Sequence, residues 1–333
     1  MSALESPWAA WKIPKWTRWL GVSLLGAALL VLVARQTNWH DFSARLRDLL
    51  WGPVIMGVAV FYLPWLWRGL RVWMLLGRQS SLGSTVAASC ASDFLGWLMP
   101  AGTGYLSLPV ILSSYLDVRL TWGAKALVAG RLMDMVTLCS IAAVACASAE
   151  DVYTPLRVVA LPSIALTVLG LALLLWPDQV GRSMLGVFRG LGGNSKGKVG
   201  RFLEDLLTIK DTAAFHGLLP DLMVISLLIV VSRIAALWLI CVGLRAPMTV
   251  GQAAYLWSVT SLLGQLPIHP PCMAGVSDAI NAGVFMSIGW SRQQAAEVVL
   301  GARVVTMPVL LAVAGSAWAM LVRVSARARR EGT

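Results

Sequence analysis

Charged side chains are scarce in this chain, where Asp, Glu, Lys and Arg make up 13% of the 333 residues. Soluble proteins carry about 25% charged residues, so the composition excludes an ordinary soluble globular domain. Hydrophobic residues make up 58%, and the mean hydropathy is +0.74. Apolar runs of about 20 residues recur along the chain, which is the length that crosses the hydrocarbon core of a bilayer. The sequence therefore predicts an all-α polytopic membrane protein.

Cysteine is also scarce, with five residues and no Cys-x-x-Cys pair. Most of them lie within apolar stretches, which favours packing residues over a disulfide framework or a metal site. The sequence contains no metal-ligand spacing, no Ser-His-Asp pattern, no P-loop and no glycine-rich nucleotide fingerprint. We therefore expect no metal, no cofactor, no catalytic residue and no ATP-driven pump, and we expect the protein not to be an enzyme.

Acidic residues are outnumbered by basic ones, 16 against 27, and the formal net charge is +11. A basic balance of this kind is typical of nucleic-acid-binding domains, but here the basic residues lie in loops between apolar runs. We expect these residues to contact anionic lipid headgroups and to set the membrane topology. We expect no nucleic-acid partner.

Six apolar runs are long enough to form full spans. Their approximate ranges are 19–35, 52–76, 122–147, 155–176, 217–243 and 294–322. The first run follows basic residues and has no small-residue cleavage site, so we expect a retained helix rather than a signal peptide. Two further apolar regions, 84–116 and 250–290, are interrupted, and each could form a re-entrant hairpin or two short crossings.

Proline and glycine make the two interruptions. These residues are Pro100, Gly102 and Gly104 in the first region, and Pro267, Pro270, Pro271 and Gly275 in the second. Proline removes a backbone donor and glycine permits unusual dihedral angles, so both breaks leave backbone groups open. Such backbone is tolerated at membrane depth only beside protein or water, so we expect both regions to line a cavity.

The distribution of Lys and Arg predicts the orientation of the chain. Basic residues concentrate before the first span, in the loop 178–215 and after the last span, whereas the short loop with Glu150 and Asp151 has none. This pattern places both termini on the cytoplasmic side of a bacterial inner membrane. Arg35, Arg45 and Arg47 conflict with it, and a short helix lying on the outer surface would explain their position.

With this orientation the chain divides into two halves, residues 1–150 and 151–333. Each half contains three spans and one broken region, and the two halves cross the membrane in opposite senses. Paired broken segments in an inverted repeat point to a substrate site near the midplane and to alternating access. We therefore predict six full spans, two re-entrant hairpins and a translocation function.

Motifs in both halves resemble those of a known family. They are Leu98-Met-Pro100-Ala-Gly-Thr-Gly104, Gly130-Arg131-Leu132-Met133-Asp134, and Leu266-Pro267-Ile268 followed by Pro271 to Asp278. In this order and spacing they resemble the flippase-like family built on the membrane region of lysylphosphatidylglycerol synthase, over roughly residues 15–322. The resemblance implies translocation of a lipid or a lipid-linked substrate, with a hopanoid-associated role for some relatives. The soluble aminoacyl-transferase domain is lacking, so lipid aminoacylation is not expected.

The chain departs from the family pattern at several acidic positions. Tyr105 and Gly130 stand where the family usually has Glu, and Asp278 replaces a Glu. Cys272 and Met273 replace two glycines. Fewer acidic groups indicate a divergent substrate or a changed coupling mechanism.

Charged residues within the apolar runs are the candidate substrate-binding groups, because a charge in the membrane core costs about 2.5–3.5 kcal/mol. Arg131 and Asp134 lie on one helical face, where Arg131 could bind a lipid phosphate that Asp134 orients, or the two could neutralise each other. Arg303 could make a second headgroup contact or could form a clamp with Asp278. Arg233 could be a further cavity charge or could satisfy a carbonyl at a broken helix.

For three other charged residues, a structural role is favoured over substrate binding. Arg68 and Arg71 lie near the end of a span, which favours snorkelling to the interface over attraction of headgroups. Asp93 precedes the first break, which favours capping or packing over carriage of a coupling proton. Most of the 16 Trp residues are expected in interfacial belts.

The sequence therefore predicts a protein that moves an anionic phospholipid, a polyprenyl-linked intermediate or a hopanoid-type lipid between leaflets. A non-catalytic accessory protein of a lipid-synthesis pathway is the main alternative, and an integral lipid-modifying enzyme is a weaker one. The sequence leaves open a lipid-synthesis enzyme as partner and a homo-oligomeric state.

Overall fold

The computed structural model describes residues 15–99, 104–148, 160–175, 212–246, 248–264 and 275–330. Within these ranges every regular element is a helix, which confirms the all-helical prediction. The helices are α1 (Lys15–Gln36), α2 (Trp39–Arg47), α3 (Trp51–Leu75), α4 (Leu82–Leu98), α5 (Ser107–Leu116), α6 (Leu120–Ser148), α8 (Ala160–Leu175), α11 (Thr212–Gly243), α12 (Val250–Leu263), α13 (Val276–Ser287) and α14 (Arg292–Arg330).

Several helices are long and apolar enough to cross a membrane. Among the described residues these stretches are Trp51–Leu75, Leu120–Ala145, Gly217–Gly243 and Arg292–Ala326. They coincide with four of the six predicted spans. Helices α1 and α8 occupy the other two positions, but their apolar stretches are shorter, Ser23–Gln36 and Pro162–Ala172. The count of six full spans therefore stays a prediction.

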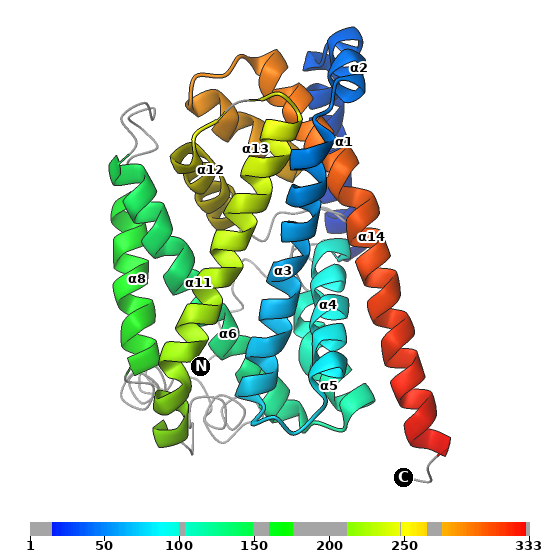
Figure 1. Ribbon diagram of the computed structural model, residues 1–333, viewed down its shortest axis with the longest axis vertical. Coiled ribbons are helices and arrows are strands. Elements are labelled where there is room, and N and C mark those ends of the chain that lie inside the picture. Colours follow the sequence, from blue (N-terminus) through cyan, green and yellow to red (C-terminus); the bar gives the residue numbers. More distant parts are fainter. Residues whose placement is uncertain are drawn as a thin grey trace, which may run out of the picture.

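The long helices run roughly along the longest axis of the molecule (Figure 1). Helix α3 packs most extensively against α11, α8 packs against α6, and α14 packs against α4. One core cluster lies between α11, α12, α13 and the start of α14, and another lies between α3, α4, α5 and α14. Because lipid chains are as apolar as these side chains, close van der Waals packing of the helices holds the bundle around the two broken regions.

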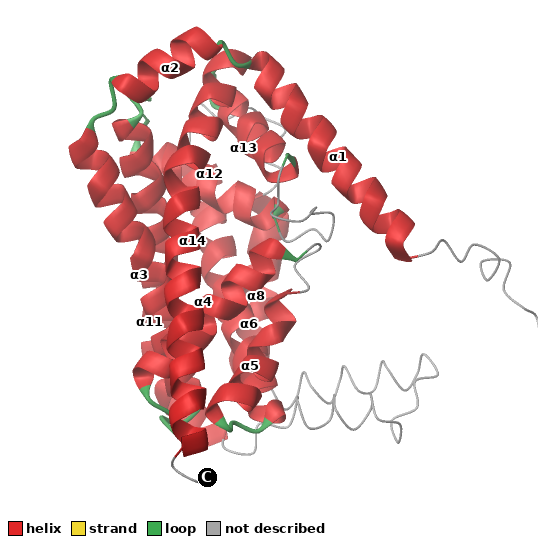
Figure 2. Cartoon of the chain, turned by 90° about the vertical axis from the view of Figure 1, so that its right-hand side faces the viewer, coloured by secondary structure: helices red, strands yellow, loops and turns green. Residues whose placement is uncertain are grey.

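The broken regions form two hairpins at opposite ends of the bundle. Helices α4 and α5 lie in the half that contains the C-terminus, and α12 and α13 lie in the other half (Figures 1 and 2). The partners of each pair pack against each other. Each hairpin therefore enters from one end and turns back toward it, which favours the re-entrant arrangement over two short crossings.

Two of the predicted break residues are glycines in the described part of the chain, and each is required by its surroundings. A Cβ atom on Gly104 would lie 1.9 Å from the carbonyl oxygen of Leu95, where the chain returns against α4. Gly275 has φ +78°, and a Cβ there would lie 1.8 Å from the carbonyl oxygen of Gly26 on α1. The other break residues lie outside the described residues: Pro100, Gly102, Pro267, Pro270 and Pro271.

A short helix explains the basic segment after the first apolar run, as predicted. Helix α2 lies at the end opposite the C-terminus (Figure 2), with Phe42 buried. The Nε of Arg45 lies 2.8 Å from a carboxylate oxygen of Glu297, which is buried. Gln293 joins this pair by donating to Glu297 at 2.9 Å and to Asp41 at 3.0 Å. The ion pair ties α2 to the start of α14.

Candidate functional site

Two cavities lie between the hairpins and the long helices. The first has a volume of about 360 Å³, and the second has about 210 Å³. Arg233, Trp97 and Trp257 line both. All six charged residues that the sequence predicts as substrate-binding line one or both of them: Asp93, Arg131, Asp134 and Arg233 in the first, and Asp278, Arg303 and Arg233 in the second.

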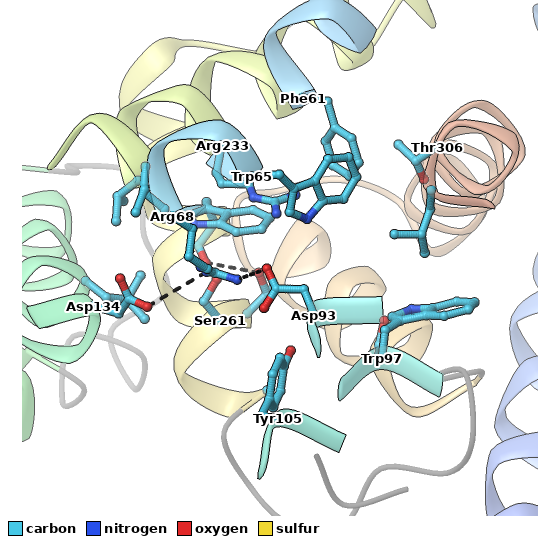
Figure 3. A pocket seen from close by; sticks show the side chains of 18 of the residues that line it. Phe61, Trp65, Arg68, Asp93, Trp97, Tyr105, Asp134, Arg233, Ser261 and Thr306 are labelled. Carbon is cyan, nitrogen blue, oxygen red and sulfur yellow. Dashed lines mark hydrogen bonds and ion pairs between the residues drawn. The ribbon is translucent and has the colours of Figure 1, made fainter. Parts of the chain in front are cut away.

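An ion-pair network forms one side of the first cavity (Figure 3). Arg68 on α3 pairs with Asp93 on α4, and its second nitrogen lies 3.8 Å from Asp134 on α6. Arg71 donates to Asp134 at 2.5 Å and to the hydroxyl of Ser226 at 2.8 Å. The network joins four helices through side chains that are all mostly withdrawn from the surface.

This network corrects two sequence predictions. Arg68 and Arg71 do not snorkel to the interface, because both turn inward to carboxylates and Arg71 is only 2% exposed. Of the capping or packing role expected for Asp93, the capping half is wrong, because Asp93 lies inside α4 and accepts a hydrogen bond from Arg68. A buried carboxylate attracts the nearby guanidinium more strongly than distant water does, since the dielectric constant is low there.

Arg131 forms no ion pair with Asp134, so of the two roles that the sequence left open for these residues, the mutual ion pair is wrong. The guanidinium of Arg131 lies 3.9 Å from the centre of the Tyr105 ring, in a cation–π contact. Asp134 lies one turn further along α6 and is engaged by the arginines of α3. Arg131 therefore keeps its hydrogen-bond donors available toward the cavity that it lines.

Arg233 is surrounded by aromatic rings. Its guanidinium carbon lies 4.8 Å from the ring centre of Phe61, 5.2 Å from that of Trp65 and 5.8 Å from that of Trp257. Among the described residues Arg233 donates to no carbonyl oxygen, which argues against the alternative role of satisfying a carbonyl at a broken helix. The three rings surround the cation without supplying a negative charge.

The charges around the first cavity do not balance. Arg68, Arg131 and Arg233 line it together with Asp93 and Asp134, and Arg71 pairs with Asp134 from behind the lining. The lining and the ion-pair network together therefore carry an excess of two positive charges. Within the described part of the chain, neither Arg131 nor Arg233 forms an ion pair. Uncompensated charge is costly in a low-dielectric interior, so the site favours an anion that enters it.

Apart from Arg233, which it shares with the first cavity, the second cavity is lined by one aspartate and one arginine that form an ion pair. Arg303 on α14 donates to the carboxylate of Asp278 on α13, which is the clamp that the sequence offered as an alternative to headgroup binding. The same carboxylate oxygen accepts from the backbone nitrogen of Gly275 at 2.9 Å, and Asp278 is 3% exposed. The pair fixes the start of α13 against α14.

Sequence reasoning missed the aromatic residues that hold the arginines. It placed most tryptophans in interfacial belts, but Trp65 is 4% exposed and lines the cavity with Trp97 and Trp257. Tyr105 was noted only as a substitution for an acidic residue. That substitution was itself the available signal, because it removes a negative charge beside Arg131 and supplies a ring in its place.

A charged cavity between two opposed hairpins defines a helical membrane protein with an internal polar site. The sequence model of the lysylphosphatidylglycerol synthase transmembrane region matches residues 18–315, and the chain belongs to this family. It is therefore a lipid-related membrane protein. No curated protein and no solved structure matches the chain. The described residues contain no group of three His, Cys, Asp or Glu side chains that could hold a metal ion.

Proposed function

We propose that this protein moves an anionic lipid or a lipid-linked intermediate between the leaflets of the membrane. The headgroup occupies the cavity of about 360 Å³, while the acyl part stays in the bilayer. The observation that carries the proposal is the excess of two positive charges around that cavity, with Arg131 and Arg233 held by aromatic rings instead of carboxylates. Family membership supports a lipid as the substrate.

Both arginines suit a phosphate that must bind and then leave. A guanidinium presents several N–H donors in a planar fork that matches the oxygens of a phosphate. A cation–π contact contributes about 0.5–2 kcal/mol, so the rings keep each cation in the cavity without neutralising it. The substrate supplies the missing negative charge, and its departure restores the starting state.

The opposed hairpins supply a route to both faces. In our proposal α4–α5 and α12–α13 belong to an inverted repeat of two halves, and their movements open the cavity to one face and then the other. Six helices span a bacterial inner membrane with both termini in the cytoplasm, as the loop charges favour. The residues that line the cavity come from a single copy of the chain. The headgroup passes without covalent change.

Leaflet exchange in proteoliposomes tests the proposal. Purified protein is reconstituted with headgroup-labelled phosphatidylglycerol, and separately with a labelled polyprenyl phosphate. The Arg131→Gln/Arg233→Gln variant is expected to slow exchange of the accepted lipid by about tenfold or more, because truncating one partner of a desolvated charge pair has effects of this size. Arg119→Gln is the matched control, since it removes an exposed arginine outside the cavity.

The outcome separates translocation from an accessory role. Exchange that is unchanged in the double variant contradicts the proposed site. Folded protein that exchanges neither lipid, together with a double variant that complements normally in cells, supports the accessory function instead. That alternative also predicts that changes in the loop 178–215 abolish complementation.

A further inference from the structure

The first cavity has two walls of different chemistry. Its charged lining residues all come from α3, α4, α6 and α11. The lining residues from α12, α13 and α14 include five uncharged polar side chains: Thr260, Ser261, Ser277, Asn281 and Thr306. In Figure 3, Thr306 lies on the side of the cavity opposite Asp134. A ligand that fills the cavity therefore meets charged groups from one set of helices and uncharged hydroxyl and amide groups from the other.

The uncharged wall has open hydrogen-bonding capacity. Among the described residues, the side chains of Ser261, Ser277 and Asn281 have no hydrogen-bond partner. The hydroxyl of Thr260 donates to the carbonyl of Leu256 at 2.7 Å, so its oxygen can still accept. The wall thus offers donors from Ser and Asn and acceptors from all of these oxygens, which is what a ligand with several hydroxyl groups requires.

Ser277 and Asn281 make this wall continuous between the cavities. They are four residues apart on α13, so they lie on one face of that helix, and both line both cavities. Thr260 and Thr306 also line both. Aromatic faces of Trp97 and Trp257 border the same space. A phosphate alone would contact only the arginines and would leave the hydroxyl and amide groups of the polar wall without a ligand.

We infer that the substrate headgroup joins a phosphodiester to an uncharged, sugar-sized polyhydroxylated group. This inference rests on the proposed function and specifies its substrate class. The phosphodiester meets Arg131 and Arg233, and the hydroxylated ring extends between Trp97 and the polar wall of α12, α13 and α14. A cationic headgroup is disfavoured, because it would add to the existing excess of positive charge.

Three lipids of equal charge test the headgroup preference. Phosphatidylinositol carries a hydroxylated ring, phosphatidylglycerol carries a smaller glycerol, and phosphatidylmethanol carries no hydroxyl on its headgroup. The expected order of exchange rates is phosphatidylinositol, then phosphatidylglycerol, then phosphatidylmethanol. The first and last should differ by about tenfold, which one or two hydrogen bonds supply. Equal rates for the three lipids overturn the inference and leave the proposed function intact. If none of the three lipids is exchanged, both the inference and the proposed function are contradicted.

A second comparison assigns the preference to the polar wall. The Ser277→Ala/Asn281→Ala variant should reduce the preference for phosphatidylinositol over phosphatidylmethanol to less than about threefold, with the phosphatidylmethanol rate unchanged. Ser258→Ala is the matched control, since Ser258 lies on α12, is fully buried and does not line the cavity. A preference that survives the double variant shows that these hydroxyl and amide groups only hydrate the cavity, and it overturns the assignment.

Discussion

The first hairpin, α4–α5, contributes Asp93 to a group of charges that also contains Asp134 and four arginines, whereas the second, α12–α13, contributes one aspartate that is bonded to one arginine of α14. The two regions share a helix–break–helix form and enter from opposite ends of the bundle (Figure 1). They differ in how their charges are used. At the first hairpin the positive charges outnumber the negative ones. At the second hairpin one negative charge is paired with one positive charge.

The difference indicates a division of labour between the hairpins. An excess of positive charge can attract a ligand, while a closed ion pair can only fix the elements that carry it. The first region is therefore the better candidate for headgroup binding, and the ion pair of the second region stabilises the packing of α13 against α14. Variants at the two regions should separate function from stability.

Loss of Arg71 should have the largest effect on stability. Arg71 is 2% exposed, and its removal leaves Asp134 with only the longer contact to Arg68 and leaves Ser226 without its donor. Breaking a buried ion pair by removing one partner costs about 3–5 kcal/mol, so we expect Arg71→Met to lower the free energy of unfolding by about that amount. Unfolding in detergent micelles measures it, with Arg119→Met as the exposed control. A loss below about 1 kcal/mol would contradict the network.

The clamp at the second hairpin should show strong coupling in a double-mutant cycle. Asp278→Asn and Arg303→Gln each break the ion pair between these two residues, and the double variant removes both charges. We expect a coupling energy of about 2 kcal/mol from unfolding measurements on the four proteins. Additive single effects would show that the pair does not act as a unit.

A pair of glycine substitutions sharpens the comparison at α13. Gly275→Ala places a Cβ in a backbone conformation with φ +78° and 1.8 Å from the Gly26 carbonyl oxygen, so it should destabilise by about 1–3 kcal/mol. Gly283→Ala adds a Cβ with no atom within 4 Å, inside the same helix, and should stabilise by about 0.5–1 kcal/mol. Effects of the same sign in unfolding experiments would argue against the close approach of α1 to α13.

The ring beneath Arg131 should have the smallest effect. Tyr105→Leu removes the aromatic face that lies 3.9 Å from the guanidinium and should lower stability by about 0.5–1 kcal/mol. Tyr105→Phe keeps the face and should match the parent protein. The same unfolding measurement compares them, and equal losses in both variants would assign the effect to the hydroxyl group instead.

Much of the fold was accessible from the sequence because the membrane imposes simple rules on a chain. An apolar run of sufficient length forms a helix, and Gly104 and Gly275 lie at turns where a side chain would clash. The cavity positions of Arg131 and Arg233 were likewise predictable, since a charge within an apolar helix must face the interior.

The partners of these charges were not accessible from the sequence. Arg71 bonds to Asp134, 63 residues away, and to Ser226, 155 residues away. Such contacts depend on how α3, α6 and α11 pack, and helical spacing within one segment does not report that. The same limit explains why Asp134 was assigned to Arg131, its neighbour on α6, and why the rings around Arg233 were not anticipated.

The most direct test of the charge excess at the first hairpin is the ratio of phosphatidylglycerol exchange to phosphatidylcholine exchange, measured in the same proteoliposomes. We predict a ratio well above one for the parent protein, falling toward one in Arg131→Gln/Arg233→Gln and unchanged in Arg119→Gln. A ratio that stays the same in the double variant, in protein shown to be folded, would contradict a role for the unpaired arginines in selecting an anionic lipid.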